Sequence, residues 1–239
     1  PDERCSRVCC TQAIANARRL RALNPQANVR ILYRDIRTYG FDEVLNVEPC
    51  AYNPSLPLII GSDFNVNPMC WCVGHETDKL RIHDELFIRD TNTPATLDEL
   101  YRRYGQHKSG FLFYGDAAAA QRKTSASKSD YMHILNDKRF KNARLFYPTS
   151  NPRVVDRFAS CNAMFSTKSG LRRCVVDPRC KHVIEDLTSR QWKPDGNEPD
   201  DYGDIGHMSD ALGYIIHARH PMRVEVDTSA QRVHLIQAS

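Results

Sequence analysis

The sequence predicts an α/β protein in which a mixed sheet, antiparallel over its first three strands, is flanked by helices. Short β-branched or aromatic runs bounded by Pro or Gly occur at 57–61, 69–74, 80–88 and 111–115 and favour strands. From residue 96 onward, helical and strand-like segments alternate, as they do in a sheet covered by helices. With 239 residues, of which 41% are hydrophobic and 26% charged, the chain is long enough to bury one sizeable core.

Composition argues against several other classes of protein. No apolar run approaches the ~18 residues of a membrane span, and the start, Pro1 to Arg4, lacks a signal-peptide pattern, so we expect an intracellular protein. Nine cysteines without regular spacing favour reduced thiols over a disulfide scaffold. A zinc site of Cys174, Cys180 and His182 is an alternative, although no Cys-x-x-Cys pair accompanies it. The net charge of +4 is mild and indicates a nucleic-acid partner only where basic residues cluster.

The first elements carry no recognisable chemistry. Residues 11–23 are rich in Ala, Leu and Arg and predict a helix that ends before Asn24-Pro25. Residues 29–33 and 42–52 favour two short strands. The stretch 53–57, which contains two prolines, then leads into the central strand.

The central element is a short buried strand at 58–60, in the segment Pro57-Leu-Ile-Ile-Gly-Ser-Asp-Phe-Asn-Val-Asn-Pro68. Asp63 follows this strand, at the rim of the predicted sheet, where a carboxylate either caps a turn or binds a cation. Asp116 follows the strand-like run 111–115, and Asp210 lies in a predicted helix. Taken singly, each acid is more simply a turn, cap or solvated-helix residue, but three acids so placed suggest a site for hard cations.

The remaining elements complete the alternation. Residues 69–74 and 80–88 predict antiparallel strands joined by a short turn. Thr96 is expected to cap a helix that ends at Gly105. After the strand at 111–114, the patterns predict a helix at 129–137, a strand at 144–147 and a helix at 152–165. Half of a hairpin at 171–176 and a helix at 179–191 follow. The chain then continues with an acidic loop at 192–206, a helix at 205–218, and a tail at 224–238 that is a strand pair or disordered.

Five motifs in order resemble a known family over residues 41 to 220. They are Leu56-Pro-Leu-Ile-Ile-Gly-Ser-Asp-Phe-Asn65, Tyr114-Gly-Asp-Ala117, Ser150-Asn-Pro-Arg-Val-Val-Asp-Arg157 with Asn162-Ala163, Val176-Asp-Pro-Arg-Cys180, and His207-Met-Ser-Asp-Ala-Leu-Gly-Tyr214. Together they resemble the nuclease domain of the terminase large subunit, the DNA-packaging motor protein of tailed bacteriophages. The resemblance implies a ribonuclease-H-like fold with an added hairpin, and a metal-dependent endonuclease that cuts double-stranded DNA during viral genome packaging.

The resemblance also implies a site and partners. Asp63, Asp116 and Asp210 would hold two divalent cations, Mg²⁺ or Mn²⁺, with Asp63 bridging them, and His207 and Asp204 would be auxiliary residues. The implied partners are double-stranded DNA, the terminase small subunit and the portal protein, in the cytoplasm of the infected bacterial host. Two basic groups are expected to contact DNA phosphates near this site: Arg122, Lys123 and Lys128, and around the predicted hairpin Lys168, Arg172 and Arg173.

The resemblance divides the chain into three parts. The motor domain of the family carries a Gly-x-x-x-x-Gly-Lys-Ser/Thr loop, which this sequence lacks, so residues 1–40 are expected to be a linker or the remnant of a preceding motor domain. Residues 41–225 would form the nuclease domain and 226–239 a C-terminal tail. Two other functions stay open: another ribonuclease-H-like nuclease, such as a resolvase or ribonuclease, and a non-catalytic DNA-binding assembly module.

Overall fold

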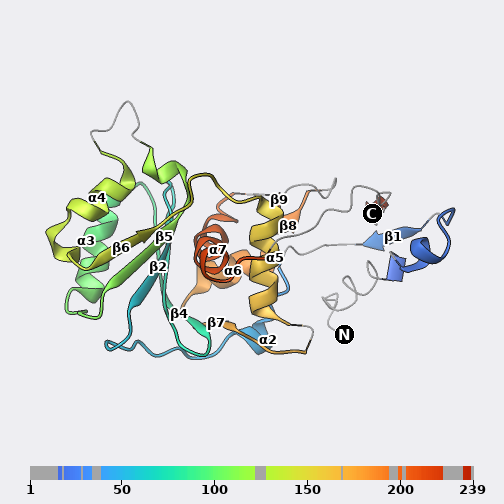
Figure 1. Cartoon of the computed structure of the whole chain (residues 1–239), viewed down its shortest axis with the longest axis horizontal. Coiled ribbons are helices and arrows are strands. Elements are labelled where there is room, and N and C mark those ends of the chain that lie inside the picture. The colour runs from blue at the N-terminus through green and yellow to red at the C-terminus, as the bar shows by residue number, and fades with distance from the viewer. Residues whose placement is uncertain are drawn as a thin grey trace.

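The centre of the protein is a mixed six-stranded sheet with the strand order β6-β5-β2-β3-β4-β7 (Figure 1). The structure is a computed structural model, and it describes residues 16–17, 19–27, 29–33, 39–121, 128–167, 169–193, 199–200, 203–222 and 234–237. Strands β2 (Leu58–Asp63), β3 (Met69–Glu76) and β4 (Leu80–Ile88) are consecutive and antiparallel. Strands β5 (Phe111–Gly115), β6 (Ala143–Phe146) and β7 (Cys174–Val176) pair in parallel with β2, β5 and β4. The predicted mixed sheet with antiparallel first strands is confirmed.

Helices cover both faces of this sheet (Figure 1). One face packs against α5 (Val154–Phe165), α6 (Lys181–Ser189) and α7 (His207–Arg219). The other face packs against α3 (Thr93–Tyr104) and α4 (Asp130–Asn136), with the short 3₁₀ turns η1 (Ala118–Ala120) and η2 (Lys138–Phe140) beside them. Side chains alternate between the two cores, as strand geometry requires: Ile59 and Cys72 belong to the first core, and Ile60 and Trp71 to the second.

Helix α7 lies in the interior and crosses β2 at Gly61. Its buried residues run almost continuously from Met208 to Ile216, so little of its circumference faces water. A Cβ at position 61 would lie 2.2 Å from the carbonyl oxygen of Ala211, a separation that atoms cannot adopt. Glycine at this position therefore allows the backbones of the strand and the helix to meet.

Three sequence predictions for this part of the chain are wrong. Residues 42–52 do not form a strand: Asp42 accepts a hydrogen bond from the Val44 N–H at 2.9 Å and caps a short helix, α2 (Glu43–Asn46). Helix α3 begins at Thr93 instead of Thr96, because Asn92 is its N-cap and Pro94 suits its first turn. Residues 171–176 are not half of a hairpin, since β7 pairs in parallel with β4; a small antiparallel pair forms instead from β8 (Gln191–Trp192) and β9 (Pro199–Asp200).

The two ends of the described chain form a separate parallel pair, β1 (Arg30–Tyr33) with β10 (His234–Gln237). The predicted helix at 11–23 is confirmed at residues 16–17 and 19–23, and its first residues lie outside the described part, as do 224–233 of the tail. Within the described residues, no helix is both long and apolar enough to cross a membrane.

Candidate active site

Asp63 and Asp116 lie side by side where neighbouring strands end. We call this side of the sheet, at the carboxyl ends of β2 and β5, the acidic edge. Strands β2 and β5 are parallel neighbours, and their register pairs Ser62 with Gly115. Asp63 ends β2 and Asp116 directly follows β5, so both carboxylates leave the sheet at the carboxyl ends of adjacent strands. Ligand sites of α/β sheets commonly occupy such an edge.

Helix α7 brings Asp210 to the same edge. The helix begins at His207 after Gly206, whose φ of 117° is a conformation that favours glycine, and the close approach at Gly61 fixes its first turns against β2. Burial raises the pKa of Asp63, and the charges of Asp210 and Asp116 raise it further. The three acids that the sequence singled out therefore interact electrostatically in the folded chain.

Asp63 has two polar neighbours that orient it. Its Oδ2 accepts a hydrogen bond from Asn65 Nδ2 at 2.8 Å and lies 3.0 Å from Nδ1 of His207. The hydrogen bond to Asp63 raises the pKa of His207, because the carboxylate stabilises the imidazolium form. Asn65 lies in the first of the five motifs but was not a predicted site residue, and His207 lies closer to Asp63 than its place one turn before Asp210 suggested.

Asp210 is paired with two buried arginines. Nη2 of Arg157 lies 2.8 Å and Nη1 of Arg190 2.6 Å from the same oxygen, Oδ1. Arg157 is also stacked over the ring of Tyr214, at 4.8 Å, and Arg190 over that of Phe158, at 5.2 Å. Asp210 is thus neither a solvated helix residue nor an isolated acid, since α5 and the end of α6 both supply a positive charge to it.

Asp116 also makes a local hydrogen bond. Its Oδ1 accepts from the backbone N–H of Ala119 in the 3₁₀ turn η1 at 2.9 Å, although the N-cap position of this turn is Ala117. Its carbonyl oxygen accepts from the hydroxyl of Tyr131 on α4 at 2.8 Å. Both contacts hold the chain rigidly just beyond β5.

The donor set of this edge suits a hard cation. Three carboxylates offer the oxygen ligands that Mg²⁺ and Mn²⁺ prefer. One oxygen of Asp63 and one of Asp210 accept no hydrogen bond from the described residues, so the bonds to their other oxygens would orient them as ligands. In the described part of the chain, however, no three His, Cys, Asp or Glu side chains already form a metal-binding group. This holds for the zinc alternative too, whose cysteines are buried in the core.

Asp186 supports the beginning of α7. Its Oδ2 accepts hydrogen bonds from the backbone N–H groups of Gly206 and Ser209, both at 2.9 Å. Burial raises the pKa of Asp186 to about 6, and the two N–H groups oppose this rise. Neither Asp186 nor Arg190 stands in a recognisable motif position for this role, so the sequence did not reveal them.

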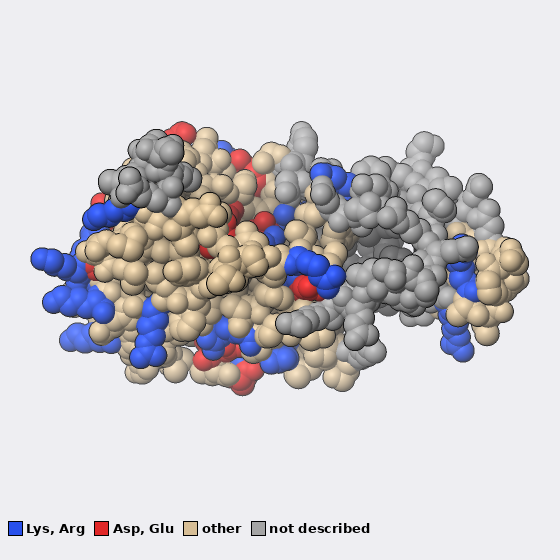
Figure 2. All heavy atoms as spheres, turned by 45° about the horizontal axis from the view of Figure 1, so that its top comes forward, with Lys and Arg blue, Asp and Glu red and all other residues tan. Residues whose placement is uncertain are grey.

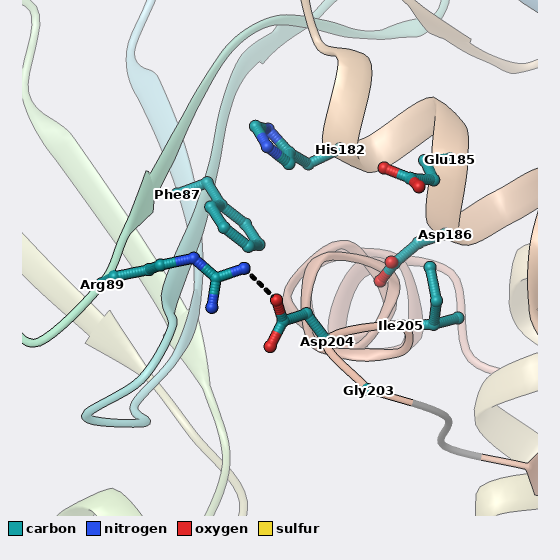
Figure 3. Close-up of a pocket in the computed structure, with 8 residues that line it drawn as sticks. All are labelled: Phe87, Arg89, His182, Glu185, Asp186, Gly203, Asp204 and Ile205. Carbon is teal, nitrogen blue, oxygen red and sulfur yellow. Dashed lines mark hydrogen bonds and ion pairs between the residues drawn. The ribbon is translucent and has the colours of Figure 1, made fainter.

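A pocket lies beside the acidic edge, between β4, α6 and the segment before α7 (Figure 3). One wall carries Phe87, Arg89 and His182, and the opposite wall carries Asp204 and Ile205. Arg89 forms an ion pair with Asp204 across it. The predicted auxiliary residue Asp204 therefore faces Arg89 in this pocket, instead of contacting the three acids.

The predicted DNA-binding residues fall into different places. Lys128 is exposed directly before α4, whose Tyr131 contacts Asp116, so it lies near the acidic edge. Arg172 and Arg173 precede β7, and the backbone bond from Leu80 N–H to the Arg173 carbonyl puts them at the opposite edge, where β4 begins. The expectation that this pair lies near the site is wrong, because β7 runs parallel to β4 from that far edge. Arg122, Lys123 and Lys168 lie outside the described residues.

A second basic region lies away from the site. Figure 2 shows Asp and Glu atoms in the middle of one face and Lys and Arg atoms gathered at the end that carries α3 and α4. Helix α3 and the neighbouring turn η2 carry exposed basic residues, among them Arg102 and Lys138. Sequence reasoning did not identify this region.

Comparisons by sequence find no relative of this chain. No protein-family model matches it, and no curated protein matches it. Comparison of folds, in contrast, finds similar solved structures.

Among these similar structures are viral large terminases and their nuclease domains. The chain is similar to the large terminase of a thermophilic bacteriophage, with 16% identity and a TM-score of 0.58 over 78% of this chain. It is similar to the nuclease domain of the P22 large terminase, with 10% identity and a TM-score of 0.56 over 79% of this chain, and to the large terminase nuclease of the thermophilic phage G20c with bound magnesium, with 15% identity and a TM-score of 0.52 over 76%.

The matches differ in how much of each relative they cover. The chain spans 46% of the first of these proteins, the large terminase, but 95% of each of the two nuclease domains. At these identities the likeness shows the fold alone. The chain has the ribonuclease-H-like fold of large-terminase nuclease domains, as its five motifs predicted.

Proposed function

We propose that this chain is the nuclease part of a terminase large subunit, a divalent-metal-dependent endonuclease that cuts double-stranded DNA during viral genome packaging. The observation that carries the proposal is the convergence of Asp63, Asp116 and Asp210 on one sheet edge, in a chain with the fold of large-terminase nuclease domains. Carboxylates that raise one another's pKa are the arrangement that hard cations stabilise.

The proposed ligands are the three aspartates, with Asp63 between the other two. Two divalent cations, Mg²⁺ or Mn²⁺, would supply an activated water and stabilise the departing oxygen of a phosphodiester. The relative from phage G20c has bound magnesium, which supports the choice of cation. His207, 3.0 Å from Asp63, is proposed as an auxiliary residue that holds a proton beside the bridging carboxylate.

The residues around the aspartates act by orienting them. Asn65 and His207 engage one oxygen of Asp63, and Arg157 and Arg190 engage one oxygen of Asp210. The N–H of Ala119 does the same for Asp116. Hydrogen bonds of this kind restrict the rotation of a carboxylate and direct its other oxygen toward a ligand.

The proposed context follows from the same likeness. Residues 41–225 would be the nuclease domain, with 1–40 a linker or remnant of a motor domain and 226–239 a tail. Double-stranded DNA would be the substrate, the terminase small subunit and the portal protein the partners, and the cytoplasm of the infected bacterium the place of action. Lys128 and its neighbours Arg122 and Lys123 remain proposed phosphate contacts, as does Lys168.

A non-catalytic DNA-binding module is the second candidate. The pairing of Asp210 with two buried arginines favours it, because a carboxylate already neutralised by the protein gains less from a cation. Another nuclease of this fold, such as a resolvase or a ribonuclease, is a third candidate.

Digestion of supercoiled plasmid with Mg²⁺, Mn²⁺ or a chelator tests the proposal. We expect nicked, then linear, then heterogeneous products with Mn²⁺ and none with chelator. A ribonuclease would instead cut the RNA strand of an RNA–DNA hybrid and spare the plasmid. If calorimetry detects no binding of either cation and the plasmid stays intact, the proposal is wrong and the non-catalytic module is favoured. Products that stop at discrete fragments would show that the chain itself reads sequence.

A further inference from the structure

Arg89 leaves the sheet at the same edge as Asp63 and on the same face. The register pairs Asp63 with Cys70 on β3 and Cys70 with Phe87 on β4, so these three side chains share one face. Arg89 follows two residues after Phe87, just beyond the end of β4. Strands lie ~4.8 Å apart and residues rise ~3.4 Å along a strand, so Arg89, two strands across and two residues further along, emerges roughly 12 Å from Asp63. The two side chains are therefore close enough to contact the same DNA backbone.

The guanidinium of Arg89 is held in place before any ligand arrives. It lies over the ring of Phe87, at 5.4 Å from the centroid, and the ring of His182 stacks on Phe87 at 4.0 Å and 4°. His182 is in turn fixed by Glu85, whose Oε1 lies 2.7 Å from its Nδ1. A stacked guanidinium keeps its planar fork of donors, which fits the two oxygens of a phosphate.

Asp204, the ion-pair partner of Arg89, is easily displaced. Both side chains are exposed, Arg89 by 53% and Asp204 by 38%, and an exposed ion pair contributes little to stability. Asp204 also lies between Gly203 and Gly206, whose φ values of 63° and 117° are in the range that favours glycine. The carboxylate can therefore turn away without disturbing a regular element.

The acidic edge is negatively charged, so an arginine that exchanges Asp204 for a DNA phosphate would help DNA to bind there. Asp63, Asp116, Asp204 and Glu185 would all repel a DNA backbone that approaches the site. Arg157 and Arg190 cannot offset this repulsion at the surface, because both are buried against Asp210. Arg89 is exposed, and its guanidinium is paired with one competing anion, the carboxylate of Asp204.

We propose that Arg89 binds a backbone phosphate of DNA near the cut position, and that Asp204 forms an ion pair with Arg89 when no DNA is bound. The inference rests on the proposed nuclease function and adds a substrate-binding residue to its site. The phosphate displaces Asp204, which leaves the pocket wall opposite Phe87. Asp204 is thus a competitor for Arg89 and not an auxiliary of the metal site.

Fluorescence anisotropy with a labelled DNA duplex tests this inference, with Ca²⁺ in place of Mg²⁺ and over a range of salt concentrations. Arg89→Ala is expected to weaken binding roughly fivefold at low salt and to reduce the slope of log K against log salt by about 0.9, the effect of one lost phosphate contact. Asp204→Asn is expected to strengthen binding in the wild-type background and to strengthen it less in the Arg89→Ala background, where only the loss of one repelling charge remains. Arg89→Lys should be intermediate, since it keeps the charge and loses the fork.

Arg81→Ala is the matched control. Arg81 is an arginine of β4 that pairs with Asp78 beside the β3–β4 turn, at the opposite edge from Asp63, so its loss should leave binding unchanged. The inference is overturned if Arg89→Ala keeps the wild-type affinity and slope, if Asp204→Asn strengthens binding equally without Arg89, or if the wild type binds no duplex. A wild type that binds DNA through Arg89 but never cuts plasmid would overturn the proposed nuclease and not this contact.

Discussion

Arg157 donates a hydrogen bond from Nη2 to Oδ1 of Asp210 at 2.8 Å, and this bond joins α5 to α7 at the edge of the sheet. Both groups are largely removed from water, with Arg157 exposed by only 6%. A charge in this position is tolerated because its counter-ion is present. Gly213 leaves room for Arg157, since a Cβ there would lie only 3.0 Å from Cδ of Arg157.

Replacing Arg157 with Met should therefore destabilise the protein by about 3 kcal/mol, because Asp210 loses one of its two cations. Urea unfolding measures the change. The double variant Arg157→Met/Asp210→Asn should lose less than the sum of the two single variants, since the Arg157–Asp210 interaction is then lost once and not twice, while Arg190 meets an amide in place of the Asp210 carboxylate in both variants that carry Asp210→Asn. Arg102→Met, which breaks an exposed pair, should cost less than about 1 kcal/mol. Additive effects would show that Arg157 and Asp210 do not interact.

Replacing Asp63 with Ala should abolish plasmid cutting with either cation and raise the melting temperature of the metal-free protein by a few degrees. Burial and the neighbouring acids raise the pKa of Asp63, so its ionised form destabilises the fold at neutral pH. Added Mn²⁺ should stabilise the wild type and not this variant in a thermal-shift assay. Asp98→Ala, an exposed acid on α3, is the control for loss of one charge. Wild-type cutting by purified Asp63→Ala would end the metal-site proposal.

Replacing Gly61 with Ala should destabilise the protein by about 1–3 kcal/mol and reduce cutting, because the new methyl group would push α7, and with it Asp210, away from β2. Gly40→Ala is the matched control, since its Cβ would meet Oδ1 of Asn162 at an ordinary 3.7 Å. Chemical denaturation and the plasmid assay measure the two effects. Equal stability of the two variants would mean that α7 and β2 do not approach each other closely at position 61.

The stability difference between wild type and Asp186→Asn should depend on pH. The pKa of Asp186 is raised from 3.8 to about 6 in the folded chain, so the folded state holds a proton that the unfolded state releases between these values. The free energy of unfolding gained from this proton is fully present below pH about 4 and is lost as pH rises through 6. At most it is about 3 kcal/mol. The melting temperature of the wild type, relative to that of the variant, should be higher at pH 4.5 than at pH 7. A constant difference would contradict the raised pKa.

The strands were predictable because their signals are local. Runs such as Leu58–Ile60 are short, β-branched and bounded by Pro57 and Gly61, and these features act on the backbone whatever else the chain does. The strand expected at 42–52 failed because the side chain of Asp42 competes locally and caps a helix turn. The expected hairpin at 171–176 failed for another reason: the partner of β7 is β4, which lies some ninety residues earlier in the chain.

The residues of the candidate site also divide into those that the sequence reveals and those that only the fold brings together. Asp63 and Asp116 could be found because each directly follows a buried strand, and a chain position at the end of a strand is visible in sequence. Arg190 could not be found, because its role depends on Asp210 and Gly206 across a loop and on burial that its own neighbours do not indicate. The pairing of Arg89 with Asp204 joins two elements that only the fold brings together.

Helix α7 has a consequence for the order in which this protein folds. It packs against β2, β3 and β5, yet it follows β2 in the chain by about 150 residues. Contacts between such distant segments form late and slowly, because a long loop must close before they contribute. During synthesis, the early strands must wait for α7 with one apolar face uncovered, a state prone to aggregation. The same event that completes the core delivers Asp210 to Asp63, so a ribosome-bound chain without α7 cannot possess the acidic site.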